Sequence, residues 1–164
     1  MTAGGWFLLR PKQTGAAVQR PSPPAWDATH EKAFLAEQLR RSPKPTPILL
    51  RLAQMERADG DLAGARRHLE EAIADDGSQL DVRLELGLVC SEMGDVAEAE
   101  QQNQAVLRIT PGQPDALYNL GAIAANRGDE RLARQYWMSA VASGRSGDAA
   151  AKALAGIQKL QAGR

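Results

Sequence analysis

Landmarks recur at one constant interval along most of this chain. Leucines keep that interval at Leu52, Leu86, Leu120 and Leu154, and alanines keep it at Ala65, Ala99 and Ala133. Three glycine–aspartate pairs share the same step, at Gly60–Asp61, Gly94–Asp95 and Gly128–Asp129. Self-similarity with a fixed period of about 34 residues indicates a stack of equivalent supersecondary units. The sequence therefore predicts a repeat structure in preference to one irregular globule.

Each unit is predicted to be two helices joined by a tight turn, and the units span residues 46–79, 80–113 and 114–147. In the second unit, the apolar side of a first helix comes from Leu84, Leu86, Leu88 and Val89. Gly94 allows the left-handed backbone that ends a helix. Asp95 is expected to cap the next helix, with Glu98 completing a capping box. The chain is therefore predicted to be all-α.

The flanks of the repeats have different characters. Residues 1–26 contain several glycines and prolines without a sustained period, which favours a flexible segment. A helix over 28–41 is expected next, capped by Asp27 or Thr29 and ended by Pro43. Asp148 then begins a last helix over 148–162.

Charge is unevenly distributed although 20 basic and 20 acidic residues cancel. Residues 1–45 carry seven Lys/Arg against three Asp/Glu, whereas residues 46–147 carry ten against sixteen. An acidic body argues against nucleic acid as a partner, because such binding depends on neutralising phosphates. The basic leading segment is either a solvated tail or a contact for a membrane surface or an acidic partner.

Residues that would carry enzymatic or metal chemistry are scattered. Cys90 is the only cysteine, so the chain has no internal disulfide and no thiolate cluster, and its helical position predicts burial. His30 and His68 lack the paired spacing of metal ligands. No nucleophile elbow or phosphate-binding loop is recognisable. We therefore expect no enzyme activity, no metal and no cofactor.

The first residues leave localisation open. Trp6–Leu9 is too short for a signal-peptide core and is followed by Arg10 and Lys12. Apolar residues followed at once by basic ones look like the trailing end of a membrane helix. If Met1 is not the native start, an upstream anchor would make the protein membrane-associated or periplasmic in a bacterium. Otherwise a cytoplasmic location is expected.

The repeats resemble the tetratricopeptide repeat family over residues 46–160. The third unit carries the motif most fully, in Leu117, Leu120-Gly121, Gly128-Asp129, Ala133, Trp137 and Ala140. The second unit departs from it at Arg83 and Asn103, and the first at Glu56. The resemblance implies a right-handed superhelix of antiparallel helix pairs over residues 27–164, with 28–41 as part of a degenerate upstream unit and 148–162 as a capping helix.

The resemblance also implies a partner-binding groove lined by the first helix of each unit. The corresponding positions here are Leu50, Gln54, Arg57, Asp81, Leu84, Leu88, Glu92, Asp115, Tyr118, Ala122 and Asn126. They form an apolar strip with acidic residues beside it, which suits an amphipathic helix or an apolar peptide. The groove lacks the concentrated positive charge that a clamp for a C-terminal carboxylate requires.

The function expected from this pattern is that of a non-enzymatic adaptor or scaffold that binds a protein or peptide. Two alternatives stay open. One is a membrane-tethered bacterial envelope assembly factor of the pilus or cytochrome c biogenesis type, and the other is a regulatory module of a separate enzyme. Self-association is also open, as is the possibility that the helix 28–41 occupies the groove itself.

Overall fold

The computed structural model describes residues 27–144 and 147–162, and every regular element within those ranges is a helix. The earlier helices are α1 (Ala28–Leu39), α2 (Thr46–Ala58), α3 (Leu62–Asp75) and α4 (Leu80–Glu92). The later helices are α5 (Val96–Ile109), α6 (Pro114–Asn126), α7 (Glu130–Ala142) and α8 (Asp148–Ala162). The prediction of an all-α repeat fold is confirmed.

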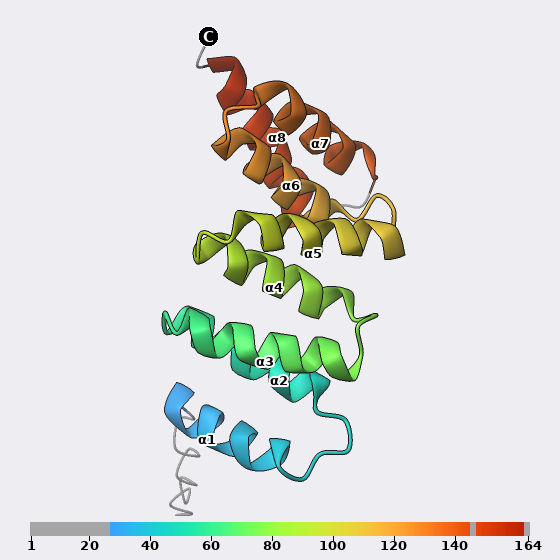
Figure 1. Ribbon diagram of the computed structural model, residues 1–164. Coiled ribbons are helices and arrows are strands. Elements are labelled where there is room, and N and C mark those ends of the chain that lie inside the picture. Colours follow the sequence, from blue (N-terminus) through green and yellow to red (C-terminus); the bar gives the residue numbers. More distant parts are fainter. Residues whose placement is uncertain (1–26, 145–146, 163–164) are drawn as a thin grey trace, which may run out of the picture.

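Successive helices are stacked along one axis, from α1 at one end to α7 and α8 at the other (Figure 1). Three pairs, α2 with α3, α4 with α5 and α6 with α7, make the most extensive contacts between elements. Each pair then packs on the next through α3 with α4 and α5 with α6, and α8 packs against both α6 and α7. Because one unit buries its apolar face against its neighbours, the core extends across units. One cluster of buried residues runs from α2 to α5 and includes Ile123 of α6, and a second joins α6, α7 and α8.

The turn inside each unit has the same backbone geometry three times. Gly60, Gly94 and Gly128 have φ angles of 85°, 81° and 81°, which a side chain would disfavour. The next residue, an aspartate in each case, donates its N–H to a carbonyl five residues back, at 2.8, 2.8 and 3.0 Å. These bonds satisfy carbonyls that the end of the first helix leaves unpaired.

The same aspartates begin the second helix of each unit. Asp61, Asp95 and Asp129 accept a hydrogen bond from the backbone N–H three residues later, at 2.9, 3.2 and 2.9 Å. The capping box predicted at Glu98 is wrong, because the N–H of Asp95 is already bonded to the Cys90 carbonyl. The Glu98 carboxylate instead accepts a hydrogen bond from the Gln102 amide at 2.6 Å.

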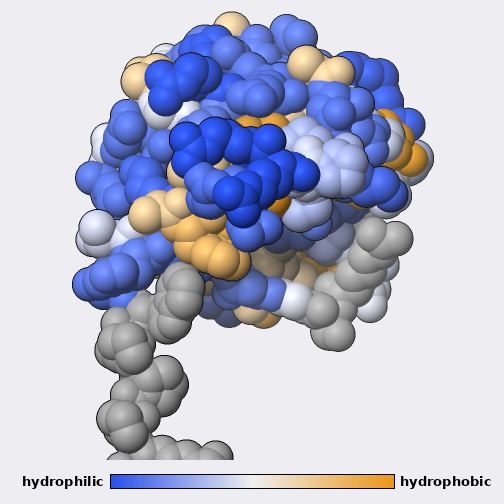
Figure 2. All heavy atoms as spheres, turned by 90° about the horizontal axis from the view of Figure 1, so that it is seen from below, coloured by the Kyte–Doolittle hydropathy of each residue, from blue (hydrophilic) through white to orange (hydrophobic). Residues whose placement is uncertain are grey.

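Helix α1 occupies the place of a second helix of a preceding unit. Its cap, Asp27, lies one repeat period before Asp61 and makes the same bond, to the N–H of His30 at 2.9 Å. The helix ends at Leu39 and not at residue 41, because Arg41 and Ser42 form turns that lead into Pro43. It contains no buried residue. The end of the stack at α1 is mostly hydrophilic, with small separate apolar areas (Figure 2).

The core of each unit depends on a pair of positions sixteen residues apart. A small residue on the first helix corresponds to a larger one on the second, giving the pairs Ala53 with Leu69, Gly87 with Asn103 and Gly121 with Trp137. The two glycines lie directly against their partners, and Ala53 and Leu69 belong to one core cluster. All six are buried, as are the alanines at 65, 99 and 133. The small residue therefore makes room for the larger side chain beneath it.

The two polar departures from the repeat pattern are buried and hydrogen-bonded. Asn103 is 1% exposed, donates to the Ala99 carbonyl at 2.8 Å and accepts from Asn119 at 3.0 Å. Glu56 is 5% exposed and lies 2.7 Å from His68 Nδ1 and 3.8 Å from Lys32 Nζ. A buried polar group without partners would be costly, and these partners remove that cost.

Candidate partner-binding groove

A hollow with a volume of about 640 Å³ lies between α6 and α8. Its lining residues come from three helices and are Tyr118, Ala122, Ala125, Asn126, Glu130, Trp137, Lys152, Ala155, Gly156, Lys159 and Leu160. A smaller hollow of about 170 Å³ adjoins it over α4 and α6 and shares two of those residues, Tyr118 and Lys152. We call the surface that carries both hollows the groove face.

Small residues explain why the surface is hollowed at α8. Ala122, Ala125 and Ala155 leave space where longer side chains would fill the angle between α6 and α8. Trp137 is 6% exposed and also lines this hollow. The ring of Tyr118 stacks on the Trp137 indole, with the ring centroids 6.4 Å apart and the planes at 23°. The hollow therefore has a largely apolar and aromatic lining.

The structure brings six of the eleven predicted groove residues into the two hollows. Tyr118, Ala122 and Asn126 line the larger one, and Leu84, Leu88, Asp115 and again Tyr118 line the smaller one. The other five, Leu50, Gln54, Arg57, Asp81 and Glu92, line neither of these hollows. Leu50 instead packs against the buried core cluster that contains Leu49 and Leu86.

Two of those five are engaged with each other. Arg57 Nε donates to Glu85 Oε1 at 2.7 Å, and one terminal nitrogen of Arg57 donates to Glu92 Oε1 at 2.8 Å. The hydrogen bond to Glu85 is the main cause that raises the pKa of Arg57 above its ordinary value, and Glu92 adds to it. The predicted acidic flank is therefore neutralised at Glu92.

Helix α1 does not cover the groove face. Within residues 27–144 and 147–162, α1 packs against α2 and against no other helix. Lys32 contributes ion pairs to Glu56 and Asp59, both at 3.8 Å, and Glu31 pairs with Arg51 at 2.7 Å. The helix is thereby kept at the end of the stack, away from α6 and α8.

Residues 56–120 match the family model of the tetratricopeptide repeat. The chain therefore carries tetratricopeptide repeats (TPRs) over residues 56–120. Solved structures agree with this TPR fold. A TPR protein from Parabacteroides merdae ATCC 43184 superimposes with a TM-score of 0.70 at 18% identity, covering 84% of this chain and 55% of that one. YrrB, described as a TPR protein with an unusual peptide-binding site, gives 0.67 at 21% identity, covering 78% and 66%.

MamA gives a TM-score of 0.65 at 15% identity, covering 83% of this TPR chain and 88% of its own. Among curated proteins, the putative cellulose synthase operon protein C of Escherichia coli O157:H7 is 28% identical over 125 residues. That alignment covers 72% of this chain but only 11% of the relative. The TPR chain therefore spans about a tenth of the length of the curated relative that it matches.

Sequence reasoning missed the contribution of α8 to the groove face. The larger hollow takes Lys152, Ala155, Gly156, Lys159 and Leu160 from that helix. The TPR register could have found four of them, because residues 152, 156, 159 and 160 stand one repeat period after 118, 122, 125 and 126. The resemblance to the repeat family gives this helix only a capping role. The predicted groove therefore does not include the lysines of α8.

Features for binding a metal or crossing a membrane are absent from the described part of the TPR chain. Within residues 27–144 and 147–162, no group of histidine, cysteine, aspartate or glutamate could hold a metal ion. None of the helices in the described residues has the length and apolar character to cross a membrane. The residues behind the anchor hypothesis, Trp6–Leu9, lie outside the described ranges.

Proposed function

We propose that this chain is a non-catalytic interaction module that binds a segment of a partner protein on the groove face formed by α4, α6 and α8. The observation that carries the proposal is the continuity of two apolar hollows over three successive first helices, joined at Tyr118 and Lys152. Grooves of this kind bind helices or extended peptides through a row of apolar anchors. The proposal includes the absence of catalysis.

The size of the hollows supports a peptide-like ligand. The larger hollow, at about 640 Å³, is within the range of roughly 300–1,000 Å³ that is typical of small-molecule pockets, so it has room for side chains of a bound peptide. Leu84, Leu88 and Tyr118 are only half-buried, so they still have apolar area to lose on binding. Burial of apolar area contributes about 25 cal/mol per Å². Aromatic and aliphatic anchors at the centre of an interface supply most of its affinity.

The proposal is tested by selecting ligands for the purified full-length chain from a displayed library of helix-forming peptides about five turns long. Peptides that bind the groove face should lose affinity for a Leu84→Glu/Tyr118→Ala variant. They should keep it for Met138→Glu/Ile109→Glu, which changes two exposed apolar residues that line neither hollow. Thermal unfolding followed by circular dichroism establishes that both variants fold.

Trp137 offers a direct readout of occupancy. With Trp6 and Trp26 replaced by phenylalanine, Trp137 is the one remaining tryptophan, and it lines the larger hollow. A bound peptide should shift its fluorescence emission. If no peptide is enriched, or if enriched peptides bind the Leu84→Glu/Tyr118→Ala variant as well as the wild type, the proposed groove is wrong.

A further inference from the structure

We propose that the partner segment is an acidic amphipathic helix that lies along the hollow between α6 and α8. It would present two carboxylates to Lys152 and Lys159 and insert a large apolar side chain between them. This inference rests on the proposed function, because it names the chemistry of the ligand of the same groove face.

The two lysines form a regular charged edge on an apolar hollow. Both come from α8, both line the hollow, and they stand seven residues apart. Seven residues are close to two helical turns, so the two side chains share one face of α8 at a spacing of about 10.5 Å. Between them along that face are Ala155, whose small side chain leaves space open, and Gly156, on which the Trp137 ring packs.

The positive charge of this edge exceeds the negative charge in the lining of the hollow, which has two lysines and one glutamate. Lys159 has no ion-pair partner within residues 27–144 and 147–162. Lys152 pairs with Asp148 at 2.5 Å, but both side chains are more than half exposed. Exposed pairs of this kind contribute only about 0–1 kcal/mol, so a partner carboxylate can replace Asp148. Glu130, the acidic residue among those lining the hollow, is engaged in an interaction of its own.

Negative charge elsewhere on the first helices compensates only at Lys152. Glu92, at the end of α4, is held by Arg57, and so is Glu85. Asp115 lines the smaller hollow together with Lys152, and its charge adds to that of Asp148 in raising the pKa of this lysine. The larger hollow is therefore the basic part of the groove face, and charge complementarity selects an acidic ligand.

The spacing of the lysines specifies the pattern of the ligand. A helix that lies along the hollow, parallel or antiparallel to α8, advances by about 1.5 Å per residue, as α8 itself does. Carboxylates at positions i and i+7 of that helix then stand opposite Lys152 and Lys159. Position i+3 or i+4 falls between them on the same face and points a leucine, phenylalanine or tryptophan side chain toward Ala155 and the Trp137 ring.

The test uses the peptides that the full-length wild-type chain selects from the same library. The frequency of each amino acid is determined at every position of these peptides. The expected result is enrichment of Asp or Glu seven residues apart around a large apolar residue. Lys152→Glu/Lys159→Glu should weaken the binding of these peptides about fivefold or more, since each lost pair is worth up to ~1 kcal/mol. Peptides in which both acids are changed to lysine should prefer that variant to the wild type.

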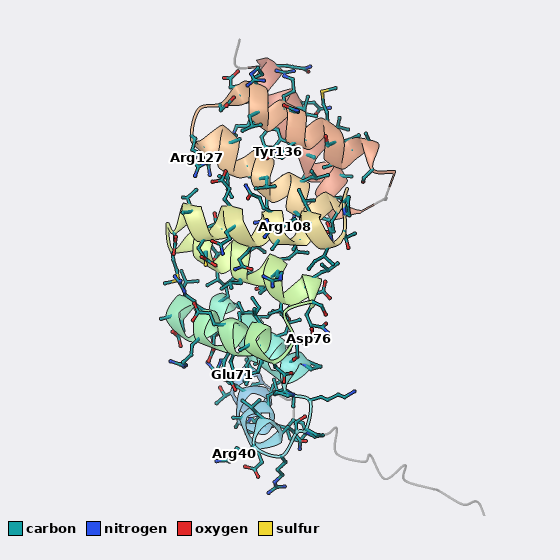
Figure 3. The ribbon with its side chains drawn as sticks, turned by 45° about the vertical axis from the view of Figure 1, so that its right-hand side comes forward. Arg40, Glu71, Asp76, Arg108, Arg127 and Tyr136 are labelled. Carbon is teal, nitrogen blue, oxygen red and sulfur yellow. The ribbon has the colours of Figure 1, made fainter. Side chains whose placement is uncertain are left out.

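A matched control separates local contact from overall charge. Arg108→Glu/Arg131→Glu changes the net charge by the same amount, but neither residue lines the hollow; Arg108 lies on α5 (Figure 3). This control should bind acidic peptides within about twofold of the wild type. If both double variants weaken peptide binding equally, the effect is long-range attraction alone and the inference is wrong.

The two proposals fail differently. The acidic helix is wrong if the selected peptides lack paired acids, or if acidic peptides bind the Lys152→Glu/Lys159→Glu variant as well as the wild type. Even then, loss of binding to the Leu84→Glu/Tyr118→Ala variant would still support the groove face as the binding site. Acids spaced by three residues would indicate an extended ligand and also contradict the helix. Absence of any selected peptide overturns both proposals.

Discussion

Gly121 lies so close to Trp137 that no side chain fits between them. A Cβ atom at residue 121 would stand 2.4 Å from Cδ1 and 2.4 Å from Nε1 of the indole. On α8, a Cβ at Gly156 would stand 2.8 Å from the six-membered ring. The Nε1 group also donates a hydrogen bond to the Tyr118 carbonyl at 3.1 Å. Two glycines and one hydrogen bond therefore hold the aromatic lining of the larger hollow in place.

The first prediction concerns this contact. Gly121→Ala should lower the free energy of unfolding by about 2–3 kcal/mol, because the rigid indole has no space into which it can move. The gain of about 1 kcal/mol in helix propensity is too small to offset the clash. Urea denaturation measures the effect. Gly87→Ala is the matched control with a smaller expected loss, since its Cβ would meet only the end of the Asn103 side chain, at 2.7 Å.

The double variant Gly121→Ala/Trp137→Leu gives a stricter check. It rebuilds in the third unit the pair that Ala53 and Leu69 form in the first, where both residues are completely buried. The clash should disappear, so the double variant should be more stable than the sum of the two single losses implies. Additive losses would show that the contact between residues 121 and 137 is not the cause.

The second prediction concerns the polar pair in the second unit. Asn103 accepts a hydrogen bond from the amide of Asn119 at 3.0 Å, and Asn103 is fully buried. A double-mutant cycle with Asn103→Ala and Asn119→Ala should give a coupling free energy of about 0.5–1.5 kcal/mol. Asn103→Ala alone should lower the free energy of unfolding more than Asn119→Ala, because it also removes the hydrogen bond to the Ala99 carbonyl and creates a cavity. A coupling near zero would contradict the hydrogen bond.

The repeat fold could be predicted from the sequence because its signals are local and periodic. The Gly-Asp pairs specify a left-handed residue followed by a helix cap, and both requirements are met within a few residues of chain. The place of α1 follows from the same arithmetic, since Asp27 is one period before Asp61. These features can be predicted without knowing the tertiary contacts.

The groove face was harder to predict, because it depends on which neighbours fill each space. Leu50 and Glu92 have the periodicity of groove residues, but Leu50 packs into the core and Glu92 pairs with an arginine one unit away. The hollow at α8 comes from small residues on separate helices, Ala122 and Ala155. Only tertiary packing shows that these two small residues face the same space.

The third prediction concerns the lone cysteine. Burial raises the pKa of the Cys90 thiol to about 11, although the nearby Arg66 guanidinium opposes the shift. In the unfolded chain the thiol ionises at about pH 8.5, so the unfolded state loses its proton first as pH rises. This contribution to stability is complete below about pH 8.5 and is lost as pH rises toward about 11.

Unfolding free energies of the wild type and Cys90→Ala at pH 8 and pH 10.5 measure this loss. The wild type should lose about 2 kcal/mol more than the variant over that interval. Other groups titrate equally in both proteins and cancel. A thiol reagent at pH 8 should also modify the wild type only at the rate at which it unfolds, because Cys90 is 0% exposed. Rapid modification of the folded protein would contradict the assigned burial.

The last prediction compares two helices that begin alike. Asp27 caps α1 and Asp61 caps α3 with the same 2.9 Å bond to an N–H three residues on, so their caps are equivalent. Their packing is not, because α3 contains four buried residues and α1 contains none. Exposed ion pairs such as Arg51 with Glu31 contribute only about 0–1 kcal/mol.

In hydrogen exchange followed by mass spectrometry, amides of α1 should therefore exchange at least about tenfold faster than those of α3. Arg51→Ala should accelerate α1 slightly and leave α3 unchanged, whereas equal protection of both helices would mean that α1 is held by more than these contacts.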